Sequence, residues 1–219
     1  MAFPMNVFGM PNFRRVGQST IVLECEAPSI SMQRRLWALA REARGRPHIA
    51  EAVVGAGNLT LAFDWRAVDY ETLRGELESA WEHTNGENVS ERTIEIPVRY
   101  GSGDGPDLQA VAQACGLPET RVIALHAAGS YVVAFVGFLP GFAYLDGLDE
   151  RLHLARRAQP RTRVPAGSVA IAGTQSAVYP FDSPGGWHVI GRTAQRMFDP
   201  DREPAALAQP GDRVRFVPA

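Results

Sequence analysis

The sequence predicts an α+β protein in which a small layer of strands and helices is followed by a β-barrel. Before residue 85, short apolar strands alternate with two amphipathic helices. From residue 131 onward, short strand-like segments are separated by glycine and proline, which is typical of a closed or strongly curved barrel. The polar tetrapeptide Asn85-Gly86-Glu87-Asn88 has the composition of a linker, so we expect one domain over residues 1–88 and another over residues 89–219.

The elements of the first domain follow from the spacing of apolar residues. Residues 20–25 alternate as a strand does, and residues 31–43 repeat apolar side chains at helical spacing. Residues 53–55 and 59–63 are expected to form two strands around a glycine-rich turn. Asp69 is expected to cap a second helix, because an aspartate side chain accepts bonds from the first free N–H groups of a helix. The order β-α-β-β-α is that of a ferredoxin-like layer.

The second domain begins with a half-buried strand over residues 93–100, where apolar side chains alternate with polar ones. A helix over residues 108–115 ends at a glycine, and a proline opens the next helix, which reaches about residue 128. Residues 131–138 are expected to form a strand. The motif PGDRVRFVP at the end of the chain predicts a turn into a closing strand.

The composition narrows the classes of function. The chain has 219 residues, 45% of them hydrophobic, which is enough for a real core, and a net charge of -2. All 22 basic residues are arginine, so mechanisms that need a lysine in this chain, such as a Schiff base or a P-loop lysine, are excluded. The near-neutral charge argues against a nucleic-acid partner. Residues 111–125 have the spacing of a helix-turn-helix but offer few polar side chains to bases, which favours two packed helices.

A cytoplasmic location is expected from the two cysteines, Cys25 and Cys115. Each lies in an apolar context typical of a small buried thiol, which fits a reducing compartment. The first residues, MAFPMNVFGMPNF, lack the pattern of a signal peptide. Residues 122–145 hold no Asp, Glu or Arg, but glycine and proline interrupt them, so a helix end and a buried strand are favoured over a membrane span.

The stretch over residues 137–192 concentrates glycine, proline and aromatic residues in three motifs, GFLPGFAYLDGLD, PRTRVPAGSVAIAG and YPFDSPGGWHVIGR. Such residues stiffen loops, allow close approach of the backbone and line pockets, so we expect a ligand pocket here. The side chains expected to form its walls, or alternatively to be barrel core, are Tyr144, Gln175, Tyr179 and Trp187. The residues expected to shape its backbone are Pro140, Gly141, Pro165, Gly167, Pro184, Gly185 and Gly186.

Arginines and one histidine are the charged candidates for this pocket. Arg161, Arg163 and Arg192 lie beside strand-like segments, and several arginines converging on a pocket would suit a carboxylate or phosphate. His126, at a helix end before a strand, either complements the helix dipole or belongs to a site. Ser168 either contacts the ligand at a strand start or only bonds within a turn.

Other kinds of site are less well supported. The five histidines show no ligand spacing, so no metal site is expected on this chain. GSGDGPD, over residues 101–107, is favoured as a plain connecting loop, with phosphate contact as the minority interpretation, because Pro106 stands where the last glycine of a GxGxxG motif would be. No nucleophile elbow is present.

The three motifs, in this order, closely resemble the B-subunit family of the prokaryotic ATP-dependent 5-oxoprolinase, also labelled allophanate hydrolase subunit 1 or KipI-like. The resemblance extends more weakly to the rest of the chain. The sequence departs from the family pattern at Ala155-Arg156-Arg157, at Ser176-Ala177 and at Ala194, and the second departure puts contacts of the Gln175 loop in doubt.

The resemblance implies an N-terminal α+β domain, a C-terminal cyclophilin-like β-barrel, and an enzyme component that works with two partners, the C subunit and the A subunit of 5-oxoprolinase. Together these open 5-oxo-L-proline to L-glutamate at the expense of ATP. The ATP site is expected to be shared with a partner, an accompanying Mg²⁺ is left open, and no biotin attachment is expected on this chain. In this hypothesis His126 is a polar or acid–base group, and Arg161 and Arg192 hold an anionic oxygen. The expected substrate contacts are Tyr144, Ser168, Gln175 and Trp187.

Two alternatives share the same motifs. The first is a KipI-like protein that inhibits a sensor histidine kinase by contact through the barrel. The second is one half of a urea or amide carboxyltransferase, which would need biotin carrier and carboxylase modules that this chain lacks. The sequence alone does not separate these alternatives from the oxoprolinase component.

Overall fold

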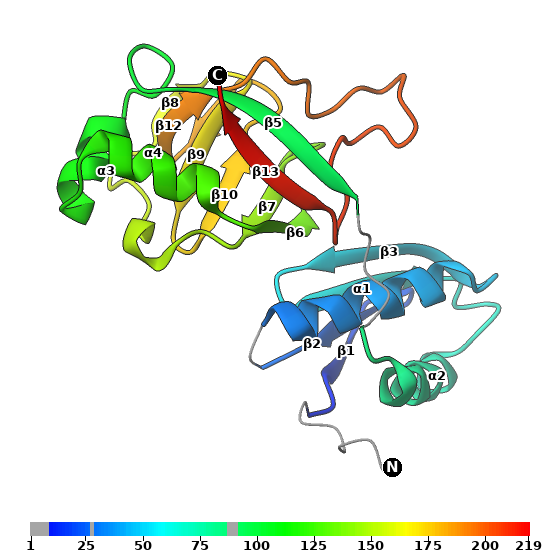
Figure 1. Cartoon of the computed structure of the whole chain (residues 1–219). Helices are drawn as coiled ribbons and strands as arrows, with labels where there is room; N and C mark the ends of the chain where they lie inside the picture. The colour runs from blue at the N-terminus through cyan, green and yellow to red at the C-terminus, as the bar shows by residue number, and fades with distance from the viewer. Residues whose placement is uncertain (1–8, 27–28, 87–91) are drawn as a thin grey trace. The chain divides into compact units, whose positions relative to one another are not determined.

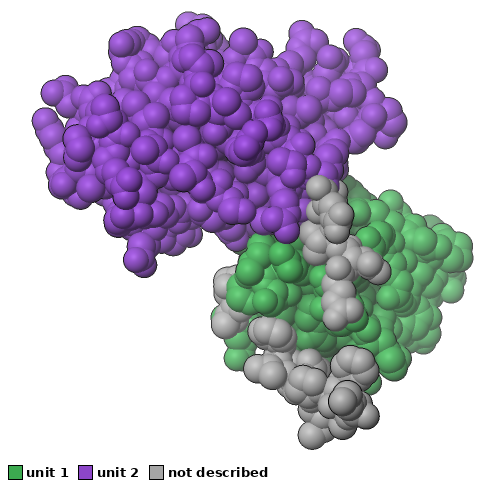
Figure 2. All heavy atoms as spheres, in the orientation of Figure 1, with its two compact units in different colours: residues 1–89 green, residues 90–219 purple. Residues whose placement is uncertain are grey.

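The computed structural model describes residues 9–26, 29–86 and 92–219. It divides the chain into two units, residues 1–89 and residues 90–219 (Figure 2). Glu87 and Asn88 of the expected linker lie outside the described residues, as do the first eight residues of the N-terminal segment. The predicted α+β class, an antiparallel sheet with helices followed by a closed barrel, is confirmed (Figure 1).

The first unit is an antiparallel sheet with two helices. The strands run in the order β1-β2-β4-β3, and every neighbouring pair is antiparallel. Helix α1 packs on β3 and β4, and α2 packs against α1. The bounds are β1 (Asn12–Val16), β2 (Thr20–Glu24), α1 (Ile30–Arg44), β3 (Ile49–Gly55), β4 (Asn58–Phe63) and α2 (Tyr70–His83).

Most of these elements agree with the sequence-based prediction, including the helix cap. The side chain of Asp69 accepts a bond of 3.0 Å from the backbone N–H of Thr72, as expected for an N-cap. Strand β1 was not predicted. It pairs only with β2 at the edge of the sheet and four of its five residues are exposed, so it lacks the apolar alternation on which the prediction depended.

A buried arginine joins the two helices of this unit. Arg35 of α1 is 5% exposed, and its Nε and Nη2 donate to the carbonyl oxygens of Thr84 (2.9 Å) and Trp81 (2.6 Å) at the end of α2. Its guanidinium also lies 3.9 Å from the centre of the Trp81 ring. Arg35 thus satisfies carbonyl groups that the end of a helix leaves without an intrahelical partner.

The second unit is a closed barrel of seven strands. Going round the barrel the order is β10-β7-β6-β13-β5-β12-β9, and only the β13–β5 pair is parallel. Strands β8 (Arg161–Val164) and β11 (Ser183–Gly185) form a separate two-stranded sheet. The barrel strands are β5 (Thr93–Tyr100), β6 (Tyr131–Val136), β7 (Ala143–Asp146), β9 (Ser168–Ala172), β10 (Gln175–Val178), β12 (His188–Arg192) and β13 (Arg213–Pro218).

Helices α3 (Leu108–Cys115) and α4 (Glu119–Ala128) pack together and complete the barrel core, and a short 3₁₀ turn, η1 (Glu150–Leu152), packs against both. Gly116 ends α3 in the left-handed conformation, at a φ of 66°, as the sequence predicts. Among the helices of the described residues, none combines the length and the apolar composition of a membrane span.

Strand β9 lies between two apolar clusters, and all five of its residues are buried. Val169 and Ile171 point into the barrel core, whereas Ala170 and Ala172 contact aromatic side chains on the other face. Alanine at these positions leaves space for large rings. The aromatic cluster outside β9 and β10 is therefore a second, smaller core, and the candidate site is built on it.

Candidate functional site

A groove opens over the aromatic cluster of the second unit, with a cavity volume of about 240 Å³. We call it the aromatic groove. Six of its residues were predicted as pocket residues from the sequence: Tyr144, Tyr179, Pro184, Gly185, Gly186 and Trp187. The remaining lining residues are Phe138, Phe142, Arg156 and Pro160.

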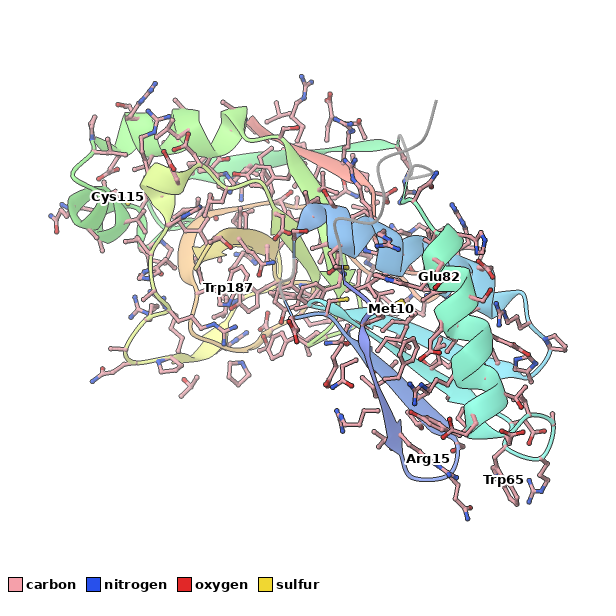
Figure 3. The ribbon with its side chains drawn as sticks, turned by 90° about the horizontal axis from the view of Figure 1, so that it is seen from below. Met10, Arg15, Trp65, Glu82, Cys115 and Trp187 are labelled. Atoms are coloured by element: carbon pink, nitrogen blue, oxygen red, sulfur yellow. The ribbon has the colours of Figure 1, made fainter. Side chains whose placement is uncertain are left out.

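Phe142 is the centre of the groove's aromatic packing. Its ring makes edge-to-face contacts with Tyr144, Tyr179 and Trp187 at centroid distances of 4.9, 5.2 and 5.8 Å. Trp187, labelled in Figure 3, is only 6% exposed. Such edge-to-face contacts favour these ring orientations and so help to set the shape of the groove wall. Phe142 was missed from the sequence, although it stands two residues before Tyr144 and so shares its face of an extended chain.

One rim of the groove is an exposed phenylalanine in an unusual backbone conformation. Phe138 has a φ of 67° and is 59% exposed, and its ring contacts the edge of Phe142 at 5.3 Å. The left-handed region costs a residue other than glycine about 1 kcal/mol or more. The turn that holds it is closed by the N–H of Gly137, which donates to the carbonyl of Phe142.

The opposite wall depends on a glycine. A Cβ atom at Gly185 would lie 2.3 Å from the hydroxyl oxygen of Tyr179, so no larger residue fits there without moving that ring. The nearby backbone N–H of Trp187 lowers the pKa of the Tyr179 hydroxyl, but burial outweighs this effect. Burial raises the pKa of both Tyr179 and Tyr144, against the opposing charge of Arg156. Both phenols are therefore protonated at neutral pH and able to donate hydrogen bonds.

Beside the groove, a buried carboxylate holds two arginines. Asp107, at the end of the GSGDGPD loop, is 3% exposed. It accepts bonds from Arg157 (2.6 Å) and from both terminal nitrogens of Arg161 (2.7 Å each). The backbone N–H of Val189 in β12 donates to it as well, at 2.7 Å. We call this set the Asp107 clamp.

In the Asp107 clamp, Arg161 and the GSGDGPD loop have roles that differ from those considered from the sequence. Burial alone raises the pKa of Asp107, but the bonds from Arg161 and Val189 and the nearby arginine charges outweigh it and lower that pKa. Arg161 was expected to hold an anionic oxygen of a ligand, yet its guanidinium is occupied by Asp107. The loop's N–H groups at residues 104, 105, 107 and 108 donate to backbone carbonyls, which leaves none of these four for a phosphate.

His126 lies in the barrel interior and does not line the aromatic groove. It is 0% exposed, and its ring stacks on Phe216 at 4.5 Å. Its Nδ1 lies 2.8 Å from the Tyr100 hydroxyl and its Nε2 lies 2.8 Å from Ser176 Oγ. All groups are satisfied when Tyr100 donates to Nδ1, Nε2–H donates to Ser176, and Ser176 donates to the carbonyl of Ala170 at 3.3 Å. The geometry thus favours a structural network over an acid–base role.

The remaining predicted residues lie outside the groove. Arg192 is exposed and its Nε donates to the carbonyl of Ala166, while Ser168 is 2% exposed and pairs with Arg192 across β9 and β12. Gln175 donates to Asp146 at 2.7 Å. Gly141, with a φ of 79°, packs against Phe198, and Gly167 packs against the Thr193 carbonyl, so each serves a tight turn. Pro140 and Pro165 precede two of these turns and line no part of the groove.

The burial of His126 predicts a pH dependence of stability. Burial lowers the pKa of His126 to about 3, whereas an unfolded histidine titrates near about 6.5. Between these values the unfolded chain binds more protons. We therefore expect the free energy of unfolding to be largest above pH of about 6.5 and to fall by up to about 1.4 kcal/mol per pH unit below it.

Denaturant titrations between pH 4.5 and 7.5 measure this slope. The variant His126→Gln is expected to lose this pH-dependent contribution to stability. The variant His153→Gln, which replaces an exposed histidine of the same unit, is expected to keep it. In addition, the NMR signals of the His126 ring should not titrate between pH 5 and 8. An equal slope in both variants, or a titrating ring, would contradict the expected neutral histidine.

Comparisons with known proteins agree on one protein family. The family model described as carboxyltransferase domain, subdomain C and D, matches residues 11–208. The 5-oxoprolinase B subunit of Escherichia coli O157:H7 is 45% identical over 205 residues, which cover 93% of this chain and 94% of that protein. The 5-oxoprolinase B subunit of Haemophilus influenzae is 44% identical over 207 residues, covering 94% and 97%.

A solved structure shares the arrangement as well. The crystal structure of TTHA0988 superposes with a TM-score of 0.81 at 40% sequence identity. The match covers 91% of this chain and 40% of that one, so this chain spans less than half the length of TTHA0988.

Proposed function

This chain belongs to the 5-oxoprolinase B-subunit family, with the carboxyltransferase C and D subdomains, and from this membership we propose that it takes part in opening 5-oxo-L-proline to L-glutamate with ATP. The observation that carries the proposal is an identity of 45% along nearly the whole length of both chains. As a B subunit, the protein works within a multi-subunit complex. We propose that its partners are the A subunit of 5-oxoprolinase and the related barrel protein that forms its C subunit.

The aromatic groove is the proposed place for the substrate on this chain. Its volume of about 240 Å³ suits a small ring better than a drug-sized molecule, which needs roughly 300 Å³ or more. Phe142 and Trp187 line the groove and provide apolar contact for the lactam ring, and the protonated hydroxyl of Tyr144 would donate a hydrogen bond to its carbonyl oxygen. In this proposal the groove binds and orients the ring.

Neither the aromatic groove nor the loop at residues 101–107 has the features of a whole nucleotide site. The groove is small, the N–H groups at residues 104, 105, 107 and 108 already donate to backbone carbonyls, and no cluster of three His, Cys, Asp or Glu side chains among the described residues could hold a metal ion. We therefore propose that ATP, with any Mg²⁺ it brings, is bound with the help of a partner protein. A cytoplasmic location is part of the same proposal, and the free thiols of Cys25 and Cys115 are compatible with it.

The proposal is tested by reconstitution. The chain is co-expressed with the A and C subunits, and glutamate released from 5-oxo-L-proline is measured with ATP, without ATP and without this chain. We expect release only when all three proteins and ATP are present. If a folded, assembled complex releases no glutamate, or if leaving this chain out makes no difference, the proposed function is wrong.

A further inference from the structure

Arg156 differs from the arginines beside it because its charge is not used by the protein. Its side chain is exposed at the rim of the aromatic groove, and among the described residues it has no ion-pair partner. Arg157 and Arg161, by contrast, are both bound to Asp107. The carboxylate of Asp107 is therefore already paired with two neighbouring arginines. An uncompensated positive charge remains at the groove.

The backbone around Arg156 is fixed although its side chain is not. On one side, the carbonyl of Ala155 lies 2.9 Å from His188 Nε2. On the other side, the N–H of Arg157 donates to the carbonyl of Gly186 at 2.8 Å. These contacts hold Arg156 against β12 and the groove wall. A binding group placed in this way loses less freedom when a ligand arrives, which favours affinity.

The charge of Arg156 acts on the interior of the groove. It opposes the effect of burial on the pKa of both Tyr144 and Tyr179, so its field reaches the hydroxyls of two wall residues. Its Cβ lies 4.0 Å from the position of a Cβ at Gly186, another wall residue. Arg156, Tyr144 and Tyr179 all line the groove, which therefore combines aromatic walls with one positive group.

We propose that Arg156 binds the carboxylate of the substrate and so determines that the groove selects a ring that carries an acid group. This inference rests on the proposed function. A guanidinium matches a carboxylate with two parallel hydrogen bonds, and the aromatic walls match the apolar ring of a cyclic amino-acid lactam. A guanidinium also binds phosphate, so inorganic phosphate is included in the test as a competitor.

The test compares ligands with and without the carboxylate on the reconstituted complex. 2-Pyrrolidinone has the lactam ring of 5-oxo-L-proline but no acid group. In Arg156→Gln we expect the KM and the dissociation constant for 5-oxo-L-proline to rise at least about tenfold, with Arg156→Lys in between. The inhibition constant of 2-pyrrolidinone should be the same in all three proteins. The binding of L-glutamate should weaken in parallel with that of 5-oxo-L-proline, and inorganic phosphate should not compete with either ligand.

The matched control is Arg121→Gln, which removes an exposed arginine of α4 in the same unit and should leave all constants unchanged. Equal affinity of wild type and Arg156→Gln for 5-oxo-L-proline, or competition by phosphate that depends on Arg156, would overturn the inference while leaving the proposed function intact. Calorimetry on the assembled complex gives the same comparison when no turnover occurs. In that case a loss of carboxylate affinity in Arg156→Gln supports the binding role, even though the proposed function fails.

Discussion

Replacing Asp107 with alanine is expected to lower the free energy of unfolding by about 3–5 kcal/mol. The change leaves the guanidinium groups of Arg157 and Arg161 in place, without the carboxylate that both of them bind. It also leaves the N–H of Val189 without its acceptor in a buried position. Removing one member of a buried ionic group strands the others, which is why this single change costs more than an ordinary surface substitution. Denaturant titration at pH 7 measures the loss.

Asp104 provides the control from the same loop. It also binds an arginine, Arg99 at 2.8 Å, but that arginine side chain is 60% exposed. Exposed ion pairs stabilise little, so Asp104→Ala should cost about 1 kcal/mol or less. Equal losses in the two variants would show that the Asp107 clamp does not stabilise the barrel as its geometry indicates.

Acid should also reduce the stability that the Asp107 clamp provides. The pKa of Asp107 is lower in the folded chain than in the unfolded chain. Its contribution is therefore fully present above the ordinary aspartate pKa and is lost as the pH falls through the lower folded value. This pH range lies at the acid end of the pH range over which His126 changes the free energy of unfolding.

Much of the fold was predictable because the residue patterns that indicate its helices and strands lie within short segments of the chain. The strand over residues 93–100, the two helices that follow it and the Asp69 cap depend on residues within one turn or one strand of each other. The closure of the barrel is a different matter. Strand β13 pairs in parallel with β5, and Arg213 lies opposite Thr93, so the pairing joins residues that are far apart in the chain. The closing strand was predictable from its own residues, but its neighbours were not.

The site was predicted in part for the same reason. Tyr144, Trp187 and the Pro184–Gly186 turn stand out as aromatic, proline and glycine residues, and the groove contains all of them. Glycine and proline also mark turns that only pack tightly, which explains why Gly141 and Gly167 lie elsewhere. The choice among arginines could not be made from the sequence. It depends on Asp107, which binds Arg161 from 54 positions away in the chain, whereas Arg156 has no ion-pair partner among the described residues.

Filling the aromatic groove is expected to have the largest effect on activity. Gly186 lines the groove, and a Cβ there would lie 3.7 Å from Pro160, which is an ordinary contact. Its φ lies outside the left-handed range, so Gly186→Leu adds a side chain without backbone strain. The leucine would occupy the space in which we propose that the lactam ring binds. We therefore expect kcat/KM for 5-oxo-L-proline to fall at least about tenfold.

The most direct test of the substrate's place in this groove is therefore kcat/KM measured side by side for complexes that contain Gly186→Leu and Gly103→Leu. A Cβ at Gly103 meets no atom within 4 Å, so the second variant adds the same side chain to the same unit away from the groove. Circular dichroism and size-exclusion chromatography establish that both fold and assemble. We predict a loss of at least about tenfold for Gly186→Leu and a wild-type value for Gly103→Leu. Wild-type activity in Gly186→Leu would contradict the assignment of the substrate to this groove.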